Sequence, residues 1–347
     1  MRANMDTKII ANPSEQDIDT LARALRNGEL VSIPTETVYG LGANGLDPEA
    51  MDKIYAAKGR PSDNPLILHV PNSESIKPLV TEISATAQAL MDAFWPGPLT
   101  ITLPKSDLVP DRATGGLPRV ALRCPDHKVC RALLERAGVP VAAPSANISG
   151  RPSPTTAQDV YHDMKGRISY ILDAGPCTIG VESTVVEVHD DKVIILRPGG
   201  ITKAQLERVV STVEYDTALV NATTSPKAPG MKYTHYAPDA PMTVVVGSPE
   251  GVAHTFKELS EGIEGPIGCL VSHETYNLIK EDGRFMCHCF GHHGDALALG
   301  HDFYKSLLHF NENHVTLILA EGVDDDGFGV AIMNRMEKAS SHHIIYK

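Results

Sequence analysis

A proline-rich segment in the second half of the chain most constrains the fold, because it separates two regions of regular pattern. From Glu214 to Ala240 the apolar periodicity stops, and SPKAPGMKYTHYAPDAP (225–241) has the composition of a linker. At 347 residues the chain is too long for one typical core and suits two. We therefore predict an N-terminal domain over 8–212, a linker over 213–240 and a C-terminal domain over 241–347.

The N-terminal region predicts a twisted mixed sheet with helices. Apolar strand segments and amphipathic helices occur there without strict alternation, which argues against a regular parallel array. A capping box at Ser14 starts the first helix and Asp47-Pro48 starts the second. The other predicted helices lie near 83–94, 127–137, 156–164 and 202–211, and the predicted strands are 29–34, 66–70, 99–103, 120–123, 140–143, 168–172, 184–188 and 193–196.

After the linker the alternation is cleaner and predicts a smaller Rossmann-like α/β domain. The expected strands are 242–246, 267–271 and 315–319, and the expected helices lie near 249–261, 296–311 and 330–339. The stretch CHCFGHH (287–293) invites a zinc assignment. Its Cys-His-Cys spacing is too tight for a usual zinc site, and we expect an exposed loop.

Composition restricts the class of protein. The net charge of −12 disfavours a protein that coats nucleic acid. No apolar run approaches the ~20 residues of a membrane span, and the first residues lack a signal-peptide pattern. The six cysteines are scattered, as in a chain that needs no disulfides. We expect a soluble cytoplasmic protein that makes no membrane contact.

The stretch IPTETVYGLGANG (33–45) formally matches a dinucleotide-binding fingerprint. A true fingerprint opens a helix directly after its strand, with an acidic residue at the end of the next strand. Here five residues (35–39) separate the predicted strand from the first glycine, and the next strand ends in Leu68-His69-Val70 without an acid. We therefore expect a glycine turn that lets the backbone approach a ligand, not a nicotinamide or flavin site.

Cations recur at the ends of predicted strands and helices, interleaved with hydroxyl and amide side chains. Lys58 and Arg60 follow a helix, and Arg123 follows an apolar run, where a charge is costly without an anionic partner. Arginine forks and lysine charges suit phosphate oxygens. The pattern predicts a polyphosphate pocket built from Lys58, Arg60, Arg119, Arg123, Ser145, Asn147, Arg151, Ser153 and Arg197.

With these motifs together, the chain resembles the threonylcarbamoyl-AMP synthase family in its long form, a YrdC-like domain followed by a Sua-type C-terminal domain. The residues that carry the resemblance are PTETVYGLGAN (34–44), KGRPSDNPLILHV (58–70), WPGPLT (95–100), VALRCP (120–125), APSANISGRPSPT (143–155), GVESTVV (180–186), ILRPGGIT (195–202), PGMKYTHYAP (229–238) and AIMNRMEKA (331–339).

The resemblance implies a nucleotidyltransferase that converts L-threonine, bicarbonate and ATP into threonylcarbamoyl-AMP and pyrophosphate. It also implies Mg²⁺ bound with ATP, a role in tRNA threonylcarbamoyladenosine synthesis, partner proteins that transfer the threonylcarbamoyl group to tRNA, and a direct tRNA contact as an open option. Such chemistry needs positioning and charge stabilisation more than a nucleophile, and no nucleophilic triad is present in the motifs.

The family pattern also implies roles for individual residues. The L-threonine side is Thr37, His69, Arg123, Ala143 and Ser183. The ATP side is Arg60, Asn64, Arg119, Ser145, Ser153, Arg197 and Tyr236 of the linker. The catalytic tetrad is Lys58, Arg60, Ser145 and Asn147. The linker aromatics would make it a lid over the nucleotide.

Two other functions stay open at this point. One is a non-catalytic YrdC-like module that binds RNA, which would need a broad basic surface. The other is a carbamoyltransferase of the hydrogenase-maturation type, which would need an acylphosphatase module and zinc-finger cysteine pairs that the sequence lacks.

Overall fold

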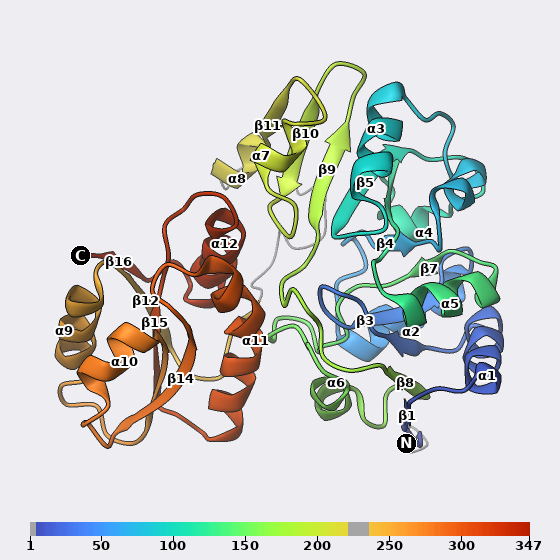
Figure 1. The fold of residues 1–347 in the computed structure, drawn as a ribbon. Coiled ribbons are helices and arrows are strands. Elements are labelled where there is room, and N and C mark those ends of the chain that lie inside the picture. Colours follow the sequence, from blue (N-terminus) through green and yellow to red (C-terminus); the bar gives the residue numbers. More distant parts are fainter. Residues whose placement is uncertain (1–4, 221–235) are drawn as a thin grey trace. The chain divides into compact units, whose positions relative to one another are not determined.

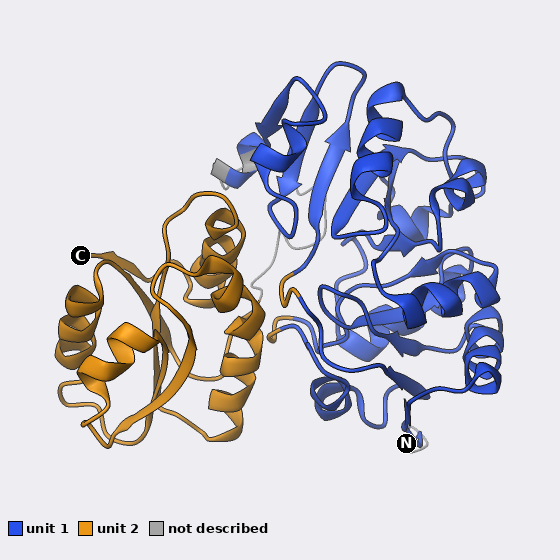
Figure 2. Cartoon of the chain, viewed as in Figure 1, with its two compact units in different colours: residues 1–149, 153–178, 182–232 blue, residues 150–152, 179–181, 233–347 orange. Residues whose placement is uncertain are grey.

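The computed structural model describes residues 5–220 and 236–347, which fall into two compact units (Figure 2). Unit 1 comprises residues 1–149, 153–178 and 182–232, and unit 2 comprises residues 150–152, 179–181 and 233–347.

Unit 1 is built on a mixed sheet, as predicted, which has eleven strands among the described residues (Figure 1). In spatial order these are β1 (Lys8–Ala11), β8 (Tyr170–Asp173), β2 (Val31–Ile33), β3 (Gly40–Asn44), β7 (Val141–Ala142), β4 (Ile67–His69), β6 (Arg119–Arg123), β5 (Leu99–Pro104), β9 (Thr184–Val188), β10 (Val193–Arg197) and β11 (Val213–Tyr215). The helices are α1 (Glu15–Arg26), α2 (Pro48–Lys58), a 3₁₀ helix (Ser73–Leu79), α3 (Ala85–Phe94), α4 (Asp111–Thr114), α5 (Lys128–Ala137), α6 (Ala157–Met164), α7 (Lys203–Leu206) and α8 (Thr217–Val220).

Local sequence signals explain the two helices that precede the central strands. The Ser14 hydroxyl accepts from the Asp17 amide at 3.2 Å and the Asp17 carboxylate accepts from the Ser14 amide at 2.8 Å, so the predicted capping box is confirmed. Helix α2 ends at Gly59, whose φ of 63° lies in the left-handed region that favours glycine. This ending turns the chain out of the helix directly after Lys58.

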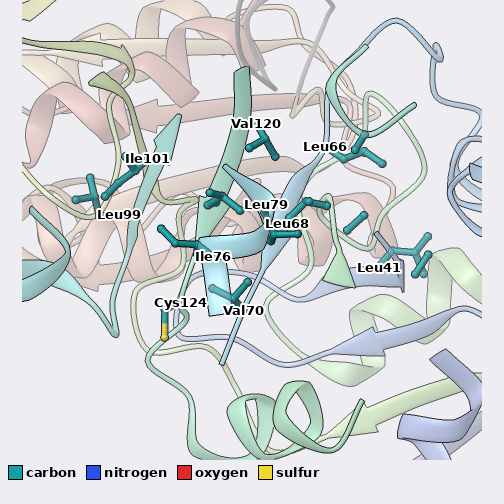
Figure 3. Close-up of a cluster of buried hydrophobic side chains, with 14 of the residues drawn as sticks. Leu41, Leu66, Leu68, Val70, Ile76, Leu79, Leu99, Ile101, Val120 and Cys124 are labelled. Carbon is teal, nitrogen blue, oxygen red and sulfur yellow. The ribbon is translucent and has the colours of Figure 1, made fainter. Parts of the chain in front are cut away.

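The strands β4, β5, β6 and β9 bury one face and leave polar groups on the other. Alternate residues of a strand point to opposite faces. The apolar set packs into the main core of unit 1 together with the 3₁₀ helix, as Figure 3 shows for Leu68, Leu99, Ile101, Val120 and Ile76. The opposite face carries a much smaller apolar cluster, and the candidate site is built on it.

Unit 2 is an all-parallel five-stranded sheet of the described residues, with helices on both faces, as predicted (Figure 1). The strand order is β14 (Phe285–Gly291), β13 (Ile267–Ser272), β15 (Leu317–Glu321), β12 (Met242–Val246) and β16 (Ile344–Tyr346). Helices α9 (Pro249–Leu259) and α10 (His273–Ile279) pack together, and α11 (Ala296–Glu312) packs with α12 (Gly329–Ala339).

The glycine stretch after Thr37 differs from the predicted turn, because Gly40–Asn44 forms strand β3. It pairs antiparallel with β2 and with β7. A Cβ atom at Gly42 would lie 2.9 Å from Val141 Cγ1 and 2.9 Å from Val31 O. Here the glycine is needed for close packing inside the sheet, and the rejection of a dinucleotide fingerprint holds because no helix follows β3 directly.

The expected loop at 287–293 is also wrong, since its first five residues belong to strand β14 at the edge of the sheet. The side chains of Phe285, Cys287 and Cys289 pack against the core of unit 2, while His288 Nε2 lies 2.9 Å from Asp302 Oδ2. The strand FMCHCFG has a single polar side chain, His288, so no apolar–polar alternation marked it, and its pairing with β13 shows that it is a strand. No cluster of three or more potential metal ligands occurs in the described ranges.

Smaller differences concern the lengths of elements. The helix expected near 202–211 is a single turn, α7, and the strand expected at 315–319 is shifted to Leu317–Glu321. Strands β1, β11 and β16, the 3₁₀ helix and helices α4, α8 and α10 were not predicted. The three strands are short and lie at sheet edges, where the apolar pattern is weakest.

Candidate active site

The polar face of the unit 1 sheet is the face opposite the main core. Strand β6 places Arg119, Ala121 and Arg123 on it, because Val120 and Leu122 point into the core. Along the middle of this face runs a small apolar strip of Ile67, Ala121, Ile194, Val185 and Leu196. At about 3.3 Å per residue, the two arginines of β6 lie roughly 13 Å apart at its ends.

Arg123 is the centre of a buried polar cluster at one end of the polar face. Its Nη1 donates to Thr37 Oγ1 at 2.9 Å, and its Nη2 lies 2.7 Å from Glu36 Oε1. Thr35 Oγ1 lies 2.9 Å from Thr37 Oγ1 and donates to the Val38 carbonyl. The motif Thr35–Thr37 therefore brings a carboxylate and two hydroxyls to one buried guanidinium.

His69 lies beside this cluster, since it is the register partner of Arg123 across β4 and β6. Burial, reinforced by the Arg123 charge, lowers the pKa of His69 to about 3 despite a hydrogen bond from Nδ1 to the Ile67 carbonyl. The imidazole is therefore neutral at physiological pH. Ala143 is adjacent, because its amide donates to the Ile67 carbonyl at 3.0 Å.

Ser183 and Arg197 extend the cluster across the sheet. Ser183 Oγ lies 2.8 Å from Thr100 Oγ1 on β5. Arg197 donates from Nε and Nη2 to the Ser183 carbonyl at 3.1 and 3.0 Å, and Nη2 also lies 3.2 Å from Ser183 Oγ. All five residues predicted to bind threonine thus meet at one end of the polar face.

Lys58, Ser145 and Asn147 form a second cluster. The Lys58 ammonium is buried and donates to the carbonyls of Ser145 and Asn147, at 2.5 and 2.6 Å. Burial and the nearby Arg60 charge lower the pKa of Lys58 well below its usual range. Ser145 Oγ donates to Asn147 Oδ1 at 2.5 Å. Lys58 therefore fixes the backbone that presents the Ser145 and Asn147 side chains.

The remaining cations predicted for ATP lie along the rim of the polar face. Arg60 donates from Nη2 to the Pro65 carbonyl at 3.2 Å, next to the buried Asn64. Arg119 donates to the carbonyls of Thr102 and Val188. A hollow of about 220 Å³ opens beside it, lined by Pro65, Leu66, Thr102, Thr114, Leu117, Pro118, Arg119, Ala121 and Glu187.

Ser153 and Tyr236 are the other two residues predicted to bind ATP. Ser153 donates to the Glu182 carboxylate at 2.7 Å, and both are buried in unit 1. Tyr236 belongs to unit 2, where its ring lies 5.3 Å from the Tyr304 ring and 6.0 Å from the Arg335 guanidinium. Its φ of 65° is unusual for a tyrosine. The other linker aromatics, Tyr233 and His235, lie outside the described residues.

Several polar residues of the candidate site were not predicted from the sequence. Glu36 lies between two residues that we singled out, and Glu182 directly precedes Ser183. Thr100 ends the motif WPGPLT. A signal was available, because each is a polar residue inside a quoted motif. Only the fold shows that all three are buried and contact predicted residues.

Comparison with known proteins identifies the family. Residues 23–199 match a family model described as telomere recombination, and residues 201–341 match the C-terminal domain of threonylcarbamoyl-AMP synthase. The threonylcarbamoyl-AMP synthase of Bacillus subtilis is 46% identical over 96% of this chain and 95% of its own length. That of Pyrococcus abyssi is 44% identical over 95% of this chain and 96% of its own length.

The chain belongs to the threonylcarbamoyl-AMP synthase family. A crystal structure of P. abyssi Sua5 complexed with L-threonine superposes with a TM-score of 0.89 at 41% identity, covering 98% of this chain and 99% of that one. The predicted enzyme class, a nucleotidyltransferase of tRNA modification, is confirmed, and the non-catalytic RNA-binding alternative is rejected. Among the described helices, none combines the length and the hydropathy needed to cross a bilayer.

Proposed function

We propose that the polar face of unit 1 converts L-threonine, bicarbonate and ATP into threonylcarbamoyl-AMP and pyrophosphate. The observation that supports this is the convergence of Thr37, His69, Arg123, Ala143 and Ser183, which come from separate stretches of sequence, at one end of a single sheet face. A P. abyssi relative is known in complex with L-threonine, which agrees with an amino-acid site in this fold.

In this proposal Arg123 pairs with the threonine carboxylate, and the neutral His69 and Ser183 surround the rest of the amino acid. Ala143 borders the methyl group. Gly40 keeps space free beside Ala143, because a Cβ atom at position 40 would lie 3.1 Å from Ala143 Cβ. One methyl group in a fitted pocket changes specificity by about 1–3 kcal/mol, so serine should be a poor substrate.

The ATP side would run from Arg60, Asn64 and Ser145 across Ser153 and Arg197 to Arg119. The threonine amine captures CO2 to give a carbamate, a carbamate oxygen attacks the α-phosphorus, and pyrophosphate leaves. Protein groups contribute by orientation and by stabilising the charge on the phosphates. Lys58 would act through Ser145 and Asn147, because its ammonium is already bonded to their carbonyls.

Mg²⁺ would enter with the triphosphate of ATP. The described residues offer no cluster of three carboxylate, histidine or cysteine ligands, so the phosphate oxygens would supply most of its coordination. When bound, the ion would neutralise phosphate charge. We further propose that the reaction takes place in the cytoplasm and that partner proteins pass the threonylcarbamoyl group to tRNA.

We retain the predicted division into a catalytic region (8–212), a lid (213–240) and a C-terminal domain (241–347), with the lid beginning only after β11, which pairs with β10 in the sheet of unit 1. Most of the lid, residues 221–235, lies outside the described part of the chain. Support for a lid comes from composition: Tyr233, His235 and Tyr236 have apolar area to bury, whereas a spacer needs only reach. A closed lid would keep water from the mixed anhydride.

The proposed function predicts that the purified protein releases pyrophosphate only when ATP, L-threonine and bicarbonate are all present. The assay follows pyrophosphate and identifies threonylcarbamoyl-AMP by mass spectrometry. A Ser183→Ala variant, which loses the hydroxyl facing Thr100, should release less pyrophosphate at low threonine. Release that does not depend on threonine would contradict the proposal.

A further inference from the structure

Glu36 is a buried carboxylate next to Arg123. Only 7% of its side chain is exposed, and its Oε1 lies 2.7 Å from Arg123 Nη2. Within the residues that the structure describes, neither carboxylate oxygen accepts a hydrogen bond. An ionised carboxylate has about four acceptor sites, and buried polar groups are nearly always bonded. Glu36 therefore has capacity for donors that the described residues do not supply.

Arg123 cannot satisfy Glu36 and a substrate carboxylate equally well. Its Nη1 already donates to Thr37 and its Nε to the Gly97 carbonyl at 3.4 Å. When a substrate carboxylate pairs with the guanidinium, Glu36 loses most of its counter-charge in a buried place, which is costly. His69 does not replace that charge at neutral pH, because its pKa is only about 3.

An α-amino acid resolves this imbalance, because it carries an ammonium group on the carbon that bears its carboxylate. Arg123 and Glu36 likewise place opposite charges side by side, since Arg123 Nη2 lies 2.7 Å from Glu36 Oε1. We propose that Glu36 binds the α-ammonium group of the substrate while Arg123 binds the carboxylate. Both buried side-chain charges then face an opposite charge, and the ammonium donors fill the empty acceptor sites of Glu36. This assignment rests on the proposed function, since it requires an amino-acid substrate.

A purely structural role is the competing interpretation. In that case Glu36 would serve only to hold Arg123 in place. Its loss would then reduce the affinity for every carboxylate ligand by the same factor. The two roles differ for a ligand that has the carboxylate and hydroxyl of threonine but no amine. (R)-3-Hydroxybutyrate is that ligand, and it keeps the configuration of the hydroxyl-bearing carbon.

The test measures binding of L-threonine and of (R)-3-hydroxybutyrate to the full-length protein by isothermal titration calorimetry. Glu36→Gln should weaken the binding of threonine by about 10- to 100-fold, which is the range for losing a hydrogen bond to a charged group. The same variant should bind (R)-3-hydroxybutyrate at least as well as the wild type, because it no longer buries an uncompensated carboxylate. Glu321→Gln removes the charge of a fully buried carboxylate of unit 2, outside the candidate site, and it should leave the ratio of the two affinities unchanged.

Three results would overturn the proposal: equal loss of affinity for both ligands, unchanged affinity for threonine, or no binding of (R)-3-hydroxybutyrate to Glu36→Gln. If Glu36→Gln does not fold, the same two affinities are measured for Glu36→Asp. This variant keeps the charge, so it should keep the preference for threonine over (R)-3-hydroxybutyrate, and loss of that preference would contradict the proposal. A wild type that does not bind threonine would refute the proposed function itself, which distinguishes the two failures.

Discussion

At the scale of single residues, the site is assembled from charges and hydroxyls that already have partners inside unit 1. Arg197 supports the backbone of Ser183, and Lys58 supports that of Ser145 and Asn147. Arg123 differs, because it contacts two side chains, Thr37 and Glu36, in addition to the Gly97 carbonyl. Arg197 and Lys58 therefore stabilise the backbone of the candidate site, whereas Arg123 is the cation that our proposal pairs with the substrate carboxylate.

Arg123→Ala and Arg60→Ala should fail in different ways. Losing a buried charged partner commonly costs about 2–5 kcal/mol, which corresponds to at least ~30-fold in affinity. Arg123→Ala should raise the KM for threonine by that factor and change the KM for ATP little, whereas Arg60→Ala should do the reverse. Titration of each substrate against each variant provides the measurement. Unchanged threonine dependence in Arg123→Ala would remove this residue from the amino-acid side.

His69 should make the protein sensitive to acid. Its folded pKa of about 3 lies below the ordinary value of 6.5, so the unfolded state takes up a proton first as the pH falls. The free energy of unfolding should therefore decrease by about 1.4 kcal/mol per pH unit below ~6.5, towards pH ~3. His69→Gln should flatten this part of the profile in urea titrations at several pH values. An identical slope in both proteins would show that His69 is not buried in its neutral form.

At the scale of elements, strand β3 shows how a sequence pattern can suit two structures. Its glycines resemble a ligand-binding turn, yet Gly40, Gly42 and Gly45 lie against β2, β7 and the chain that precedes β7. The packing places Thr35–Thr37 beside β6 by drawing the strands together. The glycines thus serve the site indirectly, through the sheet.

Gly42→Ala should destabilise the protein by about 1–3 kcal/mol, the usual cost of overpacking. The new methyl would lie 2.9 Å from both Val141 Cγ1 and Val31 O, and the second is a backbone atom that cannot rotate away. Gly283→Ala is the matched control, since nothing lies within 4 Å of its added Cβ atom. Melting temperatures of both variants test this. A Gly42→Ala protein as stable as the control would mean that the strands can separate at little cost.

At the scale of the whole molecule, the described part of the chain forms two units with different sheets. Unit 1 carries the polar face, and unit 2 is a parallel α/β unit that contains Tyr236 and two short segments, 150–152 and 179–181. Strand β11 completes the sheet of unit 1 by pairing with β10. A fragment that ends after Asp216 therefore keeps every described strand of that sheet.

This fragment should fold and bind ATP, but it should synthesise less threonylcarbamoyl-AMP because the lid and unit 2 are missing. Tyr236→Ala in the full chain should reproduce part of the loss, and Tyr236→Phe should reproduce less, since the ring that packs against Tyr304 remains. The measurement is pyrophosphate released per threonylcarbamoyl-AMP recovered. If the fragment and the full chain show the same rate and the same ratio, the linker acts only as a tether between the two units.

The sequence by itself determined the mixed sheet, the α/β C-terminal unit and most helices, and it predicted the candidate site residues other than Glu36, Glu182 and Thr100, because local periodicity, caps and motif residues are properties of neighbouring positions. Only the tertiary structure decided what depends on distant pairing. It made a strand of Gly40–Asn44 and of Phe285–Gly291, because β2, β7 and β13 supply the partners for their backbone groups. It also turned Lys58 towards the backbone and buried Glu36 against Arg123, although 87 residues separate the second pair along the chain. Such a contact follows from strand order, which no local pattern records.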